Sequence, residues 1–333
     1  MKKDIQEQAY WLLLTFESSL SVRIINGIID VWCKQLGRTL QEFFSVSSQE
    51  WTSTCHLKVE IIEKLERAKE KLSEQALLVE QLEHEHISLL TVLNGNYPAL
   101  LKSSLDPTHR PPVLCYAGDL GILGRKAIAI IGSRNAGEQS LAFTREAAQY
   151  LAEHGANVIS GNARGVDRAA YEGATSTEGC TTVVLPHGIR QLSKVQMRNL
   201  LLKIEAGNVL LMSQFPPDAP WVVSRAMERN KVVTGLAQIV LVAESDIKGG
   251  TWEGANGALK QERPVYVRRT TSSPSLPGNE ALIERGGRPL LWPTESMAET
   301  LAPLLEESGL LQQKQHESTP AEQPSLFAHI SEQ

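Results

Sequence analysis

Glycine and arginine occur together directly after two short apolar segments of the sequence. Residues 127–131 are followed by Gly132-Ser133-Arg134, and residues 157–160 by Gly161-Asn162-Ala163-Arg164-Gly165. Guanidinium groups and the free backbone N–H groups of a glycine turn both donate hydrogen bonds to anions such as phosphate. The two turns therefore indicate an anion-binding site. The alternative is that each glycine only permits a tight turn and each arginine is a solvated surface charge.

A third turn of this kind lies further along the chain, at Gly249-Gly250-Thr251. It supplies two more flexible backbone amides ahead of an expected helix. The Thr251 hydroxyl can either cap that helix or donate a hydrogen bond to a phosphate. Capping alone explains this threonine equally well.

The segments around these turns have the pattern of an α/β protein. Residues 127–131 and 157–160 are short and apolar, as buried parallel strands are, and apolar residues recur at helical spacing over 139–153 between them. Further strands are expected at 181–185, 208–212, 238–243 and 264–267, and further helices at 166–175, 191–206, 221–234 and 252–261. This alternation predicts a doubly wound, mostly parallel sheet. In such a sheet the strand carboxyl ends share one edge, which brings the three turns together.

The rest of the chain divides into further regions. Residues 1–88 predict a small N-terminal helical domain that includes one long helix over 58–86, and 89–125 predict a connector that packs on the sheet. The sheet domain is expected at 126–292. Residues 293–333 are expected to form a short helix and a polar tail from Gln312.

Composition narrows the class of protein. The chain has 333 residues, of which 42% are hydrophobic and 21% charged, with no apolar run long enough for a membrane helix or a signal segment, so a cytoplasmic protein is expected. Its four cysteines form no C-x-x-C pair, and no metal site or cofactor is expected. The net charge of −5 excludes a generally basic protein, yet residues 125–288 hold 20 Lys and Arg against 15 Asp and Glu. The basic site is therefore local.

Several ordered motifs resemble those of one known family. I-G-S-R at 131–134, S-G-x-A-R-G-V-D at 160–167 and M-E-R-N-K-V-V-T-G-L at 227–236 are similar to the DNA-processing protein family, DprA or Smf. Upstream, N-x-x-Y-P-x-L-L at 94–101 and P-P-V-L-x-Y-x-G at 111–118 are similar to the segment before the sheet in that family. The resemblance implies an extended Rossmann-like domain that binds single-stranded DNA. It also implies a homodimer and delivery of the strand to a RecA-type recombinase in natural transformation.

The same resemblance implies roles for single residues. Ser133 and Arg134 would contact phosphate, and Asp167 would orient Arg164 or cap the next helix. On the far side of the expected binding site, Lys231 stands where the family usually has arginine. Lysine keeps the positive charge but lacks the planar guanidinium group. Phe215 or Trp221 could stack a base, although core packing is the expected role of Trp221. The full expected DNA- or phosphate-binding set is Gly132, Ser133, Arg134, Gly161, Arg164, Gly165, Asp167, Arg229, Asn230, Lys231, Gly249, Gly250 and Thr251.

Three features depart from the family pattern. The N-terminal helices around 18–29 lack a glycine hairpin that would grip a DNA backbone, and no winged-helix segment is expected after the sheet. The third departure is E-S-D-I-K-G-G-T-W-E-G-A at 244–255, which is more similar to relatives that bind nucleotides.

Two alternatives therefore stay open, a nucleotide-sensing module and a nucleoside-monophosphate phosphoribohydrolase. The hydrolases carry G-G-x-G-T-x-x-E, whereas here Glu253 comes one residue early, about 100° around the helix. No catalytic residue is expected.

The C-terminal tail holds one further candidate motif. Gln323-Pro324-Ser325-Leu326-Phe327 is similar to the short motif by which bacterial proteins dock on the replicative sliding clamp. There Gln323 would anchor in one pocket, and Leu326 and Phe327 would fill a hydrophobic one. The alternative is a tail whose apolar pair packs back on the body or has no role.

Overall fold

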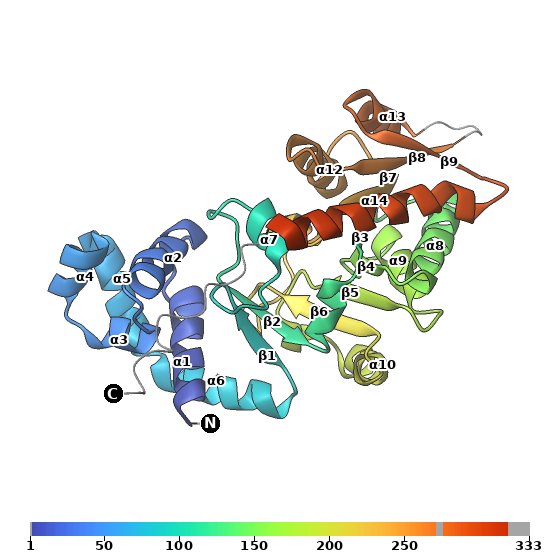
Figure 1. The fold of residues 1–333 in the computed structure, drawn as a ribbon. Coiled ribbons are helices and arrows are strands. Elements are labelled where there is room, and N and C mark those ends of the chain that lie inside the picture. The colour runs from blue at the N-terminus through green and yellow to red at the C-terminus, as the bar shows by residue number, and fades with distance from the viewer. Residues whose placement is uncertain (1, 271–275, 319–333) are drawn as a thin grey trace, which may run out of the picture.

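A nine-stranded sheet forms the centre of the protein (Figure 1). The computed structural model describes residues 2–270 and 276–318. The strand order is β1-β2-β6-β5-β4-β3-β7-β8-β9, in which β3 to β9 are parallel and β1 and β2 are antiparallel. The strands are β1 (Ser88–Thr91), β2 (Val113–Ala117), β3 (Ala127–Gly132), β4 (Asn157–Ser160), β5 (Cys180–Val184), β6 (Val209–Ser213), β7 (Ile239–Glu244), β8 (Val265–Thr270) and β9 (Arg288–Trp292). The prediction of a mostly parallel α/β sheet is confirmed.

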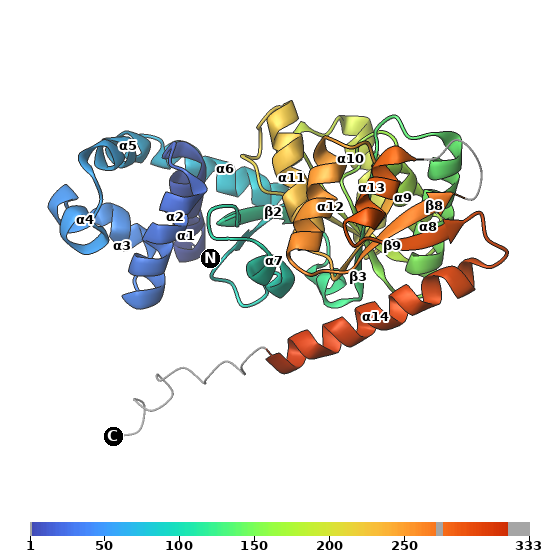
Figure 2. The same cartoon turned by 90° about the horizontal axis from the view of Figure 1, so that it is seen from above.

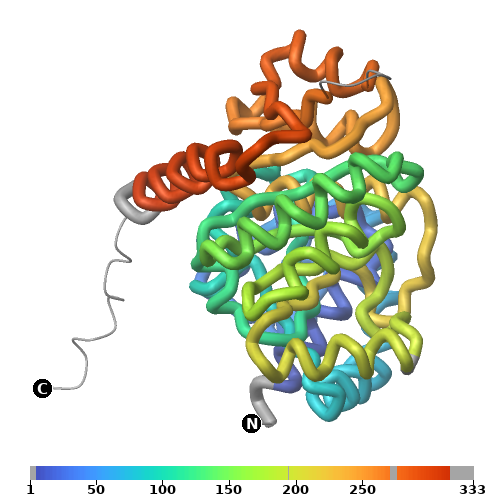
Figure 3. The backbone as a smooth tube through the Cα atoms, turned by 90° about the vertical axis from the view of Figure 1, so that its right-hand side faces the viewer, coloured from blue at the N-terminus to red at the C-terminus, as the bar shows by residue number. Residues whose placement is uncertain are grey.

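The central strands are buried on both faces because their side chains alternate between two cores. In β3, Ala129 and Ile131 belong to one buried cluster, whereas Ile128 and Ile130 belong to the other. Helices α8 (Glu138–Glu153) and α9 (Val166–Ala174) contribute to the second cluster and lie against each other, as Figure 3 shows in green. Helices α11 (Val223–Gly235), α12 (Gly250–Lys260) and α13 (Pro277–Glu284) contribute to the first cluster and lie side by side (Figure 2). Helices therefore cover both faces of the sheet.

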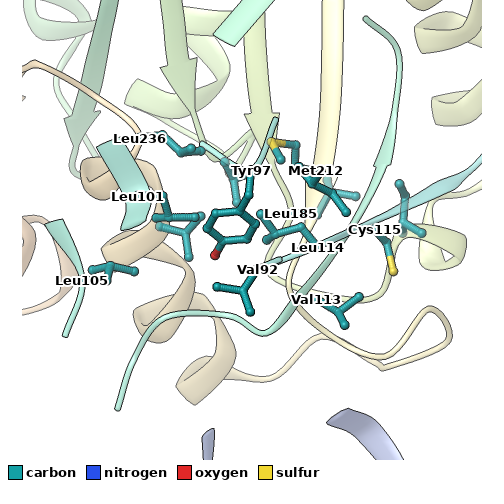
Figure 4. Close-up of a cluster of buried hydrophobic side chains, with 14 of the residues drawn as sticks. Val92, Tyr97, Leu101, Leu105, Val113, Leu114, Cys115, Leu185, Met212 and Leu236 are labelled. Carbon is teal, nitrogen blue, oxygen red and sulfur yellow. The ribbon is translucent and has the colours of Figure 1, made fainter. Parts of the chain in front are cut away.

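The connector before the sheet extends it by two antiparallel strands, β1 and β2. Figure 4 shows Tyr97 and Leu101 of this segment packed with Met212 of β6 and with Leu236 at the end of α11. Tyr97 also donates a hydrogen bond to the Pro111 carbonyl at 2.8 Å. Helix α7 (Ala99–Ser104) lies within this segment. The sequence predicted packing on the sheet but not the added strands.

Buried aromatic side chains pack together within the N-terminal helices. The ring of Phe43 lies 5.1 Å from Trp51 and 5.4 Å from Trp32, and all three side chains are buried. The single helix predicted over 58–86 is wrong, because α5 (Val59–Lys69) and α6 (Leu72–His84) are separated at Lys71, whose backbone leaves the helical region. Helix α5 packs on the turn Leu13–Glu17, whereas α6 packs on α1 (Lys2–Leu12). The two parts of the predicted helix thus make different contacts.

The C-terminal segment returns across the sheet domain. Helix α14 (Met297–Ser318) runs from β9 past α8 toward α7 (Figures 1 and 2). Its Gln312 donates to the Gly124 carbonyl. The helix thus continues past the residue at which a polar tail was expected. The proposed division into four regions stays a prediction, and Gln323, Leu326 and Phe327 lie outside the described residues.

The remaining helices belong to the N-terminal region or contact strands β5 and β6. They are the π-helical turns η1 (Leu13–Glu17) and η2 (Ile29–Gln35), α2 (Val22–Ile28), α3 (Leu40–Ser45), α4 (Ser48–Cys55), the 3-10 turns η3 (Leu120–Gly124) and η4 (Ile189–Gln191), and α10 (Lys194–Glu205). Among residues 2–270 and 276–318, no helix combines the length and apolar character that a bilayer span requires.

The close contact of α8 and α9 gives a prediction about two helical glycines. A methyl group on Gly173 would lie 2.3 Å from the Arg145 carbonyl oxygen, whereas one on Gly257 would meet nothing within 4 Å. We expect Gly173→Ala to lower the free energy of unfolding by about 1–3 kcal/mol. Gly257→Ala should leave it unchanged or raise it by up to about 1 kcal/mol, since alanine favours the helix. Urea unfolding of both variants measures this, and equal stabilities would contradict the close contact.

Candidate functional site

The strand order reverses between β3 and β7, and a cavity lies at this point. Successive strands from β3 run outward one way through β4, β5 and β6, and from β7 the other way. In such sheets ligands bind beyond the strand carboxyl ends at the reversal. The cavity there has a volume of about 340 Å³ and is lined by the turns after β3 and β7 together with parts of α9, α11 and α12. It holds Gly132, Ser133, Arg134, Asp167, Arg229, Asn230, Gly249, Gly250 and Thr251 of the expected set.

A second cavity of about 390 Å³ adjoins the first over the ends of β4 and β5. It is lined by Gly161, Arg164, His187 and Trp221, among others. Arg134 and Ala163 line both cavities, so the two form one surface, which we call the groove. The structure therefore brings the three glycine turns to one edge of the sheet.

Arg134 lies next to an exposed tryptophan. The guanidinium carbon is 5.5 Å from the centre of the Trp221 ring, and Trp221 is 48% exposed. The expectation that Trp221 packs in the core is wrong. Pro216, Pro217 and Pro220 precede it, and α11 begins only at Val223, so Trp221 lies in an irregular surface segment. Phe215, the other aromatic residue considered for stacking a base, is only 6% exposed and is therefore buried.

Arg164 is oriented by an asparagine that the sequence did not single out. Its Nη2 donates to Asn135 Oδ1 at 2.7 Å, and the Asn135 backbone N–H donates to Ser133 Oγ at 3.1 Å. Asn135 thus links the turn after β3 to the turn after β4. The expectation that Asp167 orients Arg164 is wrong. Asn135 directly follows the I-G-S-R motif, but its type and position alone do not indicate this contact.

Asp167 instead forms a buried ion pair with Arg229. The Arg229 Nη2 lies 3.4 Å from Asp167 Oδ2, and its Nη1 donates to the Val184 carbonyl at 2.8 Å. The Arg229 side chain is 2% exposed. Burial raises the pKa of the Asp167 carboxyl, against the lowering by Arg229 and by the N–H groups of Ala163 and Gly161. Burial likewise lowers the pKa of the Arg229 guanidinium. Arg229 therefore lies beneath the groove, with little surface left for a ligand.

Two glycines make this arrangement possible. A methyl group on Gly161 would lie 1.3 Å from Arg229 Nη1, so any larger residue would displace the guanidinium. Gly165 has a φ of +82°, and a methyl group there would lie 2.4 Å from the Ser133 carbonyl oxygen. The missing side chain at Gly165 lets the turn after β4 touch the turn after β3, and the missing side chain at Gly161 makes room for Arg229.

Two helix N-termini at this edge, those of α12 and α8, differ in their availability. Helix α12 starts after Gly249, which has a φ of +94° and makes no side-chain cap, and this end faces the groove. Thr251 lies inside the helix and does not cap it. At α8, in contrast, the Glu244 carboxylate accepts the Gly137 N–H at 3.1 Å. An internal carboxylate thus occupies the α8 end.

Of the two remaining expected residues, Asn230 lines the groove and Lys231 does not. Asn230 packs on Gly250, where a methyl group would meet its Nδ2 at 2.5 Å. Lys231 is exposed and lines a third cavity of about 230 Å³ beside α7, together with Glu253. This cavity meets the first one at Asn230 and Gly250. The exposed cations of the groove are Arg134, Arg164 and Lys248. No group of three or more His, Cys, Asp or Glu suited to a metal ion is found in the described part of the chain.

The comparisons with known proteins agree on one family. The family model of DNA recombination-mediator protein A matches residues 88–302. The chain belongs to this family. Among its relatives of the DprA family, the chain is 29% identical over 206 residues to Protein Smf of Escherichia coli (strain K12). The matched segment covers 62% of this chain and 54% of that protein. It is 28% identical over 221 residues to the DNA processing protein DprA of Bacillus subtilis (strain 168), covering 65% of this chain and 71% of that one. The chain thus spans about half the length of the Escherichia coli relative.

Two solved structures of DprA proteins are similar. The Streptococcus pneumoniae DprA structure has a TM-score of 0.68 at 20% identity and covers 88% of this chain and 97% of that one, a likeness of fold. The Helicobacter pylori DprA structure has a TM-score of 0.55 at 26% identity and covers 66% of this chain and 96% of that one. The latter structure is described as giving the single-stranded DNA binding mode of that protein.

The buried ion pair predicts a large effect on stability. We expect Asp167→Ala to lower the free energy of unfolding by about 3 kcal/mol, because Arg229 stays buried without its carboxylate. The exposed Arg164 serves as the control, and Arg164→Ala should change stability by less than about 0.5 kcal/mol. Urea unfolding of the two variants and the parent measures this. An Asp167→Ala protein as stable as the parent would contradict the structural role of the pair.

Proposed function

We propose that the protein binds single-stranded DNA in the groove and carries out no reaction on it. The observation that carries this proposal is the position of Arg134, which lines two adjoining cavities and makes them one continuous surface. Each cavity lies within the range of about 300–1,000 Å³ that encloses a small ligand. A ligand that fills both cavities must be longer than one small molecule, and a strand of nucleotides has such a length.

The groove residues suit the two parts of a nucleic-acid strand. Arg134, Arg164 and Lys248 are exposed cations that can neutralise phosphates, and the free N-terminus of α12 adds backbone N–H groups. Trp221 offers an exposed ring on which a base can stack without regard to sequence. Because the bases of a duplex are stacked inside, only a single strand can use both features.

Family membership supports a wider role. By its resemblance to the DprA family, we propose that the protein acts in recombination, DNA uptake or DNA protection and passes the strand to a RecA-type recombinase. A homodimer, a cytoplasmic location and docking of the tail on the sliding clamp through Gln323, Leu326 and Phe327 belong to the same proposal.

Hydrolysis of a nucleoside monophosphate is the weaker alternative. The carboxylate that such a hydrolase needs would come from Glu253, but Glu253 is exposed beside α7 and does not line the groove. A first-turn acid that stabilises the N-terminus of α12 explains this residue. Release of free adenine from AMP by the purified protein would support the alternative over the proposal.

The proposal predicts the effect of single substitutions on binding of a fluorescent oligo-dT. We expect Arg134→Ala and Arg164→Ala each to weaken binding about 10-fold, since charge-assisted hydrogen bonds to phosphate are lost. Each should also reduce the slope of log affinity against log salt by about 0.7. Trp221→Ala should weaken binding about 10-fold and leave that slope unchanged, because stacking releases no counterion.

The control is Arg145→Ala, which removes the same charge at a site outside the groove. Arg145 is exposed on α8 and pairs with Glu172 at 3.4 Å. Fluorescence anisotropy at two or more salt concentrations separates these cases. Unchanged affinity in both Arg134→Ala and Arg164→Ala would remove the groove as the binding site.

A further inference from the structure

The five-residue turn that carries Arg134, residues 133–137, is fastened at both ends to one residue of β7. The Ser133 N–H donates to the Glu244 carbonyl oxygen at 2.8 Å. At the other end, the Gly137 N–H donates to Glu244 Oε2 at 3.1 Å and the Ser140 hydroxyl to the same oxygen at 2.5 Å. Arg134 lies between these two anchors.

An irregularity in the sheet brings Glu244 to this position. Ile131 of β3 pairs with Val242 of β7, but the next residue, Gly132, pairs with Glu244, so β7 has one extra residue there. A bulge of this kind changes the direction in which the following side chain points. Without the extra residue, Gly132 would pair with Ala243 and Glu244 would lie one position further on.

Neighbouring residues hold Glu244 in place. Arg268 is 1% exposed and donates to the Ser140 hydroxyl at 2.7 Å, the hydroxyl that binds Glu244. Burial lowers the pKa of the Arg268 guanidinium, against the raising by the Glu244 carboxylate. On the other side, Asn279 accepts the Ser245 N–H at 2.8 Å and donates to the Ala243 carbonyl at 3.2 Å. The end of β7 is thus fixed from α8, β8 and α13.

We infer that Glu244 is a positioning residue for DNA binding, which holds the turn so that Arg134 lies where the two cavities of the groove meet. The inference rests on the proposed function. Asn135 in the same turn orients Arg164, so the two exposed arginines of the groove both depend on this anchor. Glu244 itself has no part in contacting the strand.

The sign of one measured effect separates positioning from simple electrostatics. A carboxylate near a phosphate-binding groove repels the strand, so removing it should raise DNA affinity if charge were its only effect. If Glu244 positions the turn, removing it should lower DNA affinity. A purely structural role would change the melting temperature and leave the affinity of the folded protein unchanged.

The experiment uses the full-length protein and a fluorescent oligo-dT at a temperature where every variant is folded. We expect Glu244→Ala to weaken binding about 5- to 10-fold, while Glu244→Gln, which keeps an oxygen acceptor for Gly137 and Ser140, restores most of the affinity. In the Arg134→Ala background, Glu244→Ala should have less than about half of its effect in the parent, because the positioned side chain is already gone. The matched control is Glu253→Ala, which removes an exposed carboxylate that does not touch the turn.

The outcomes are distinct. If Arg134→Ala leaves affinity unchanged, the proposed function is wrong and the role of Glu244 falls with it. If Arg134→Ala weakens binding but Glu244→Ala leaves it unchanged or strengthens it, the positioning role alone is wrong. Should Glu244→Ala not fold, Ser140→Ala is used instead, because it removes one of the two donors to the carboxylate. Unaltered DNA affinity of Ser140→Ala, found together with reduced DNA affinity of Glu244→Gln, would likewise overturn the inference.

Discussion

The groove depends on the buried ion pair of Arg229 and Asp167. This pair joins three elements: α11 through Arg229, α9 through Asp167 and the end of β5 through the Val184 carbonyl. Asp167 also accepts backbone N–H groups of Gly161 and Ala163, so it fixes the turn after β4. Burying two charges costs desolvation free energy, and only mutual pairing with further hydrogen bonds offsets that cost. The strict requirement for glycine at 161 follows, because no other residue leaves room for the guanidinium.

The arginines of the site have two different roles that the sequence does not distinguish. Arg229 is buried beneath the groove and joins the elements that form it, whereas Arg134 and Arg164 are exposed and place positive charge on its surface. All three follow or lie within motifs of the DprA family, and their residue type is the same. What separates them is burial, which depends on contacts between segments 60 residues or more apart in the chain, such as Asp167 with Arg229.

Sequence patterns predicted those parts of the fold that local periodicity determines. The parallel strands β3 to β8 and the helices between them follow from the alternation of apolar runs and helical spacing. Strands β1 and β2 did not follow, because the turn formers around Pro98 and Pro112 conceal two short runs that become strands only by pairing, β1 with β2 and β2 with β6. The exposure of Trp221 was missed for a related reason: its apolar side chain indicates burial, whereas three prolines keep its segment outside the helix. The three glycine turns do meet at one edge, since the parallel sheet imposes this, but Asn135 and Glu244 were found only in the structure.

The helix end that follows β3 is occupied, and this limits the kind of anion that the groove can bind. In doubly wound folds that bind nucleotides, the helix after the first strand directs its free N-terminus at a phosphate. Here the corresponding end of α8 is filled by the Glu244 carboxylate, which repels a second anion. The donors left for an anion are the N-terminus of α12 and the exposed cations, which are spread along two cavities. This spread of donors is the physical basis of the proposal that a strand with several phosphates binds there.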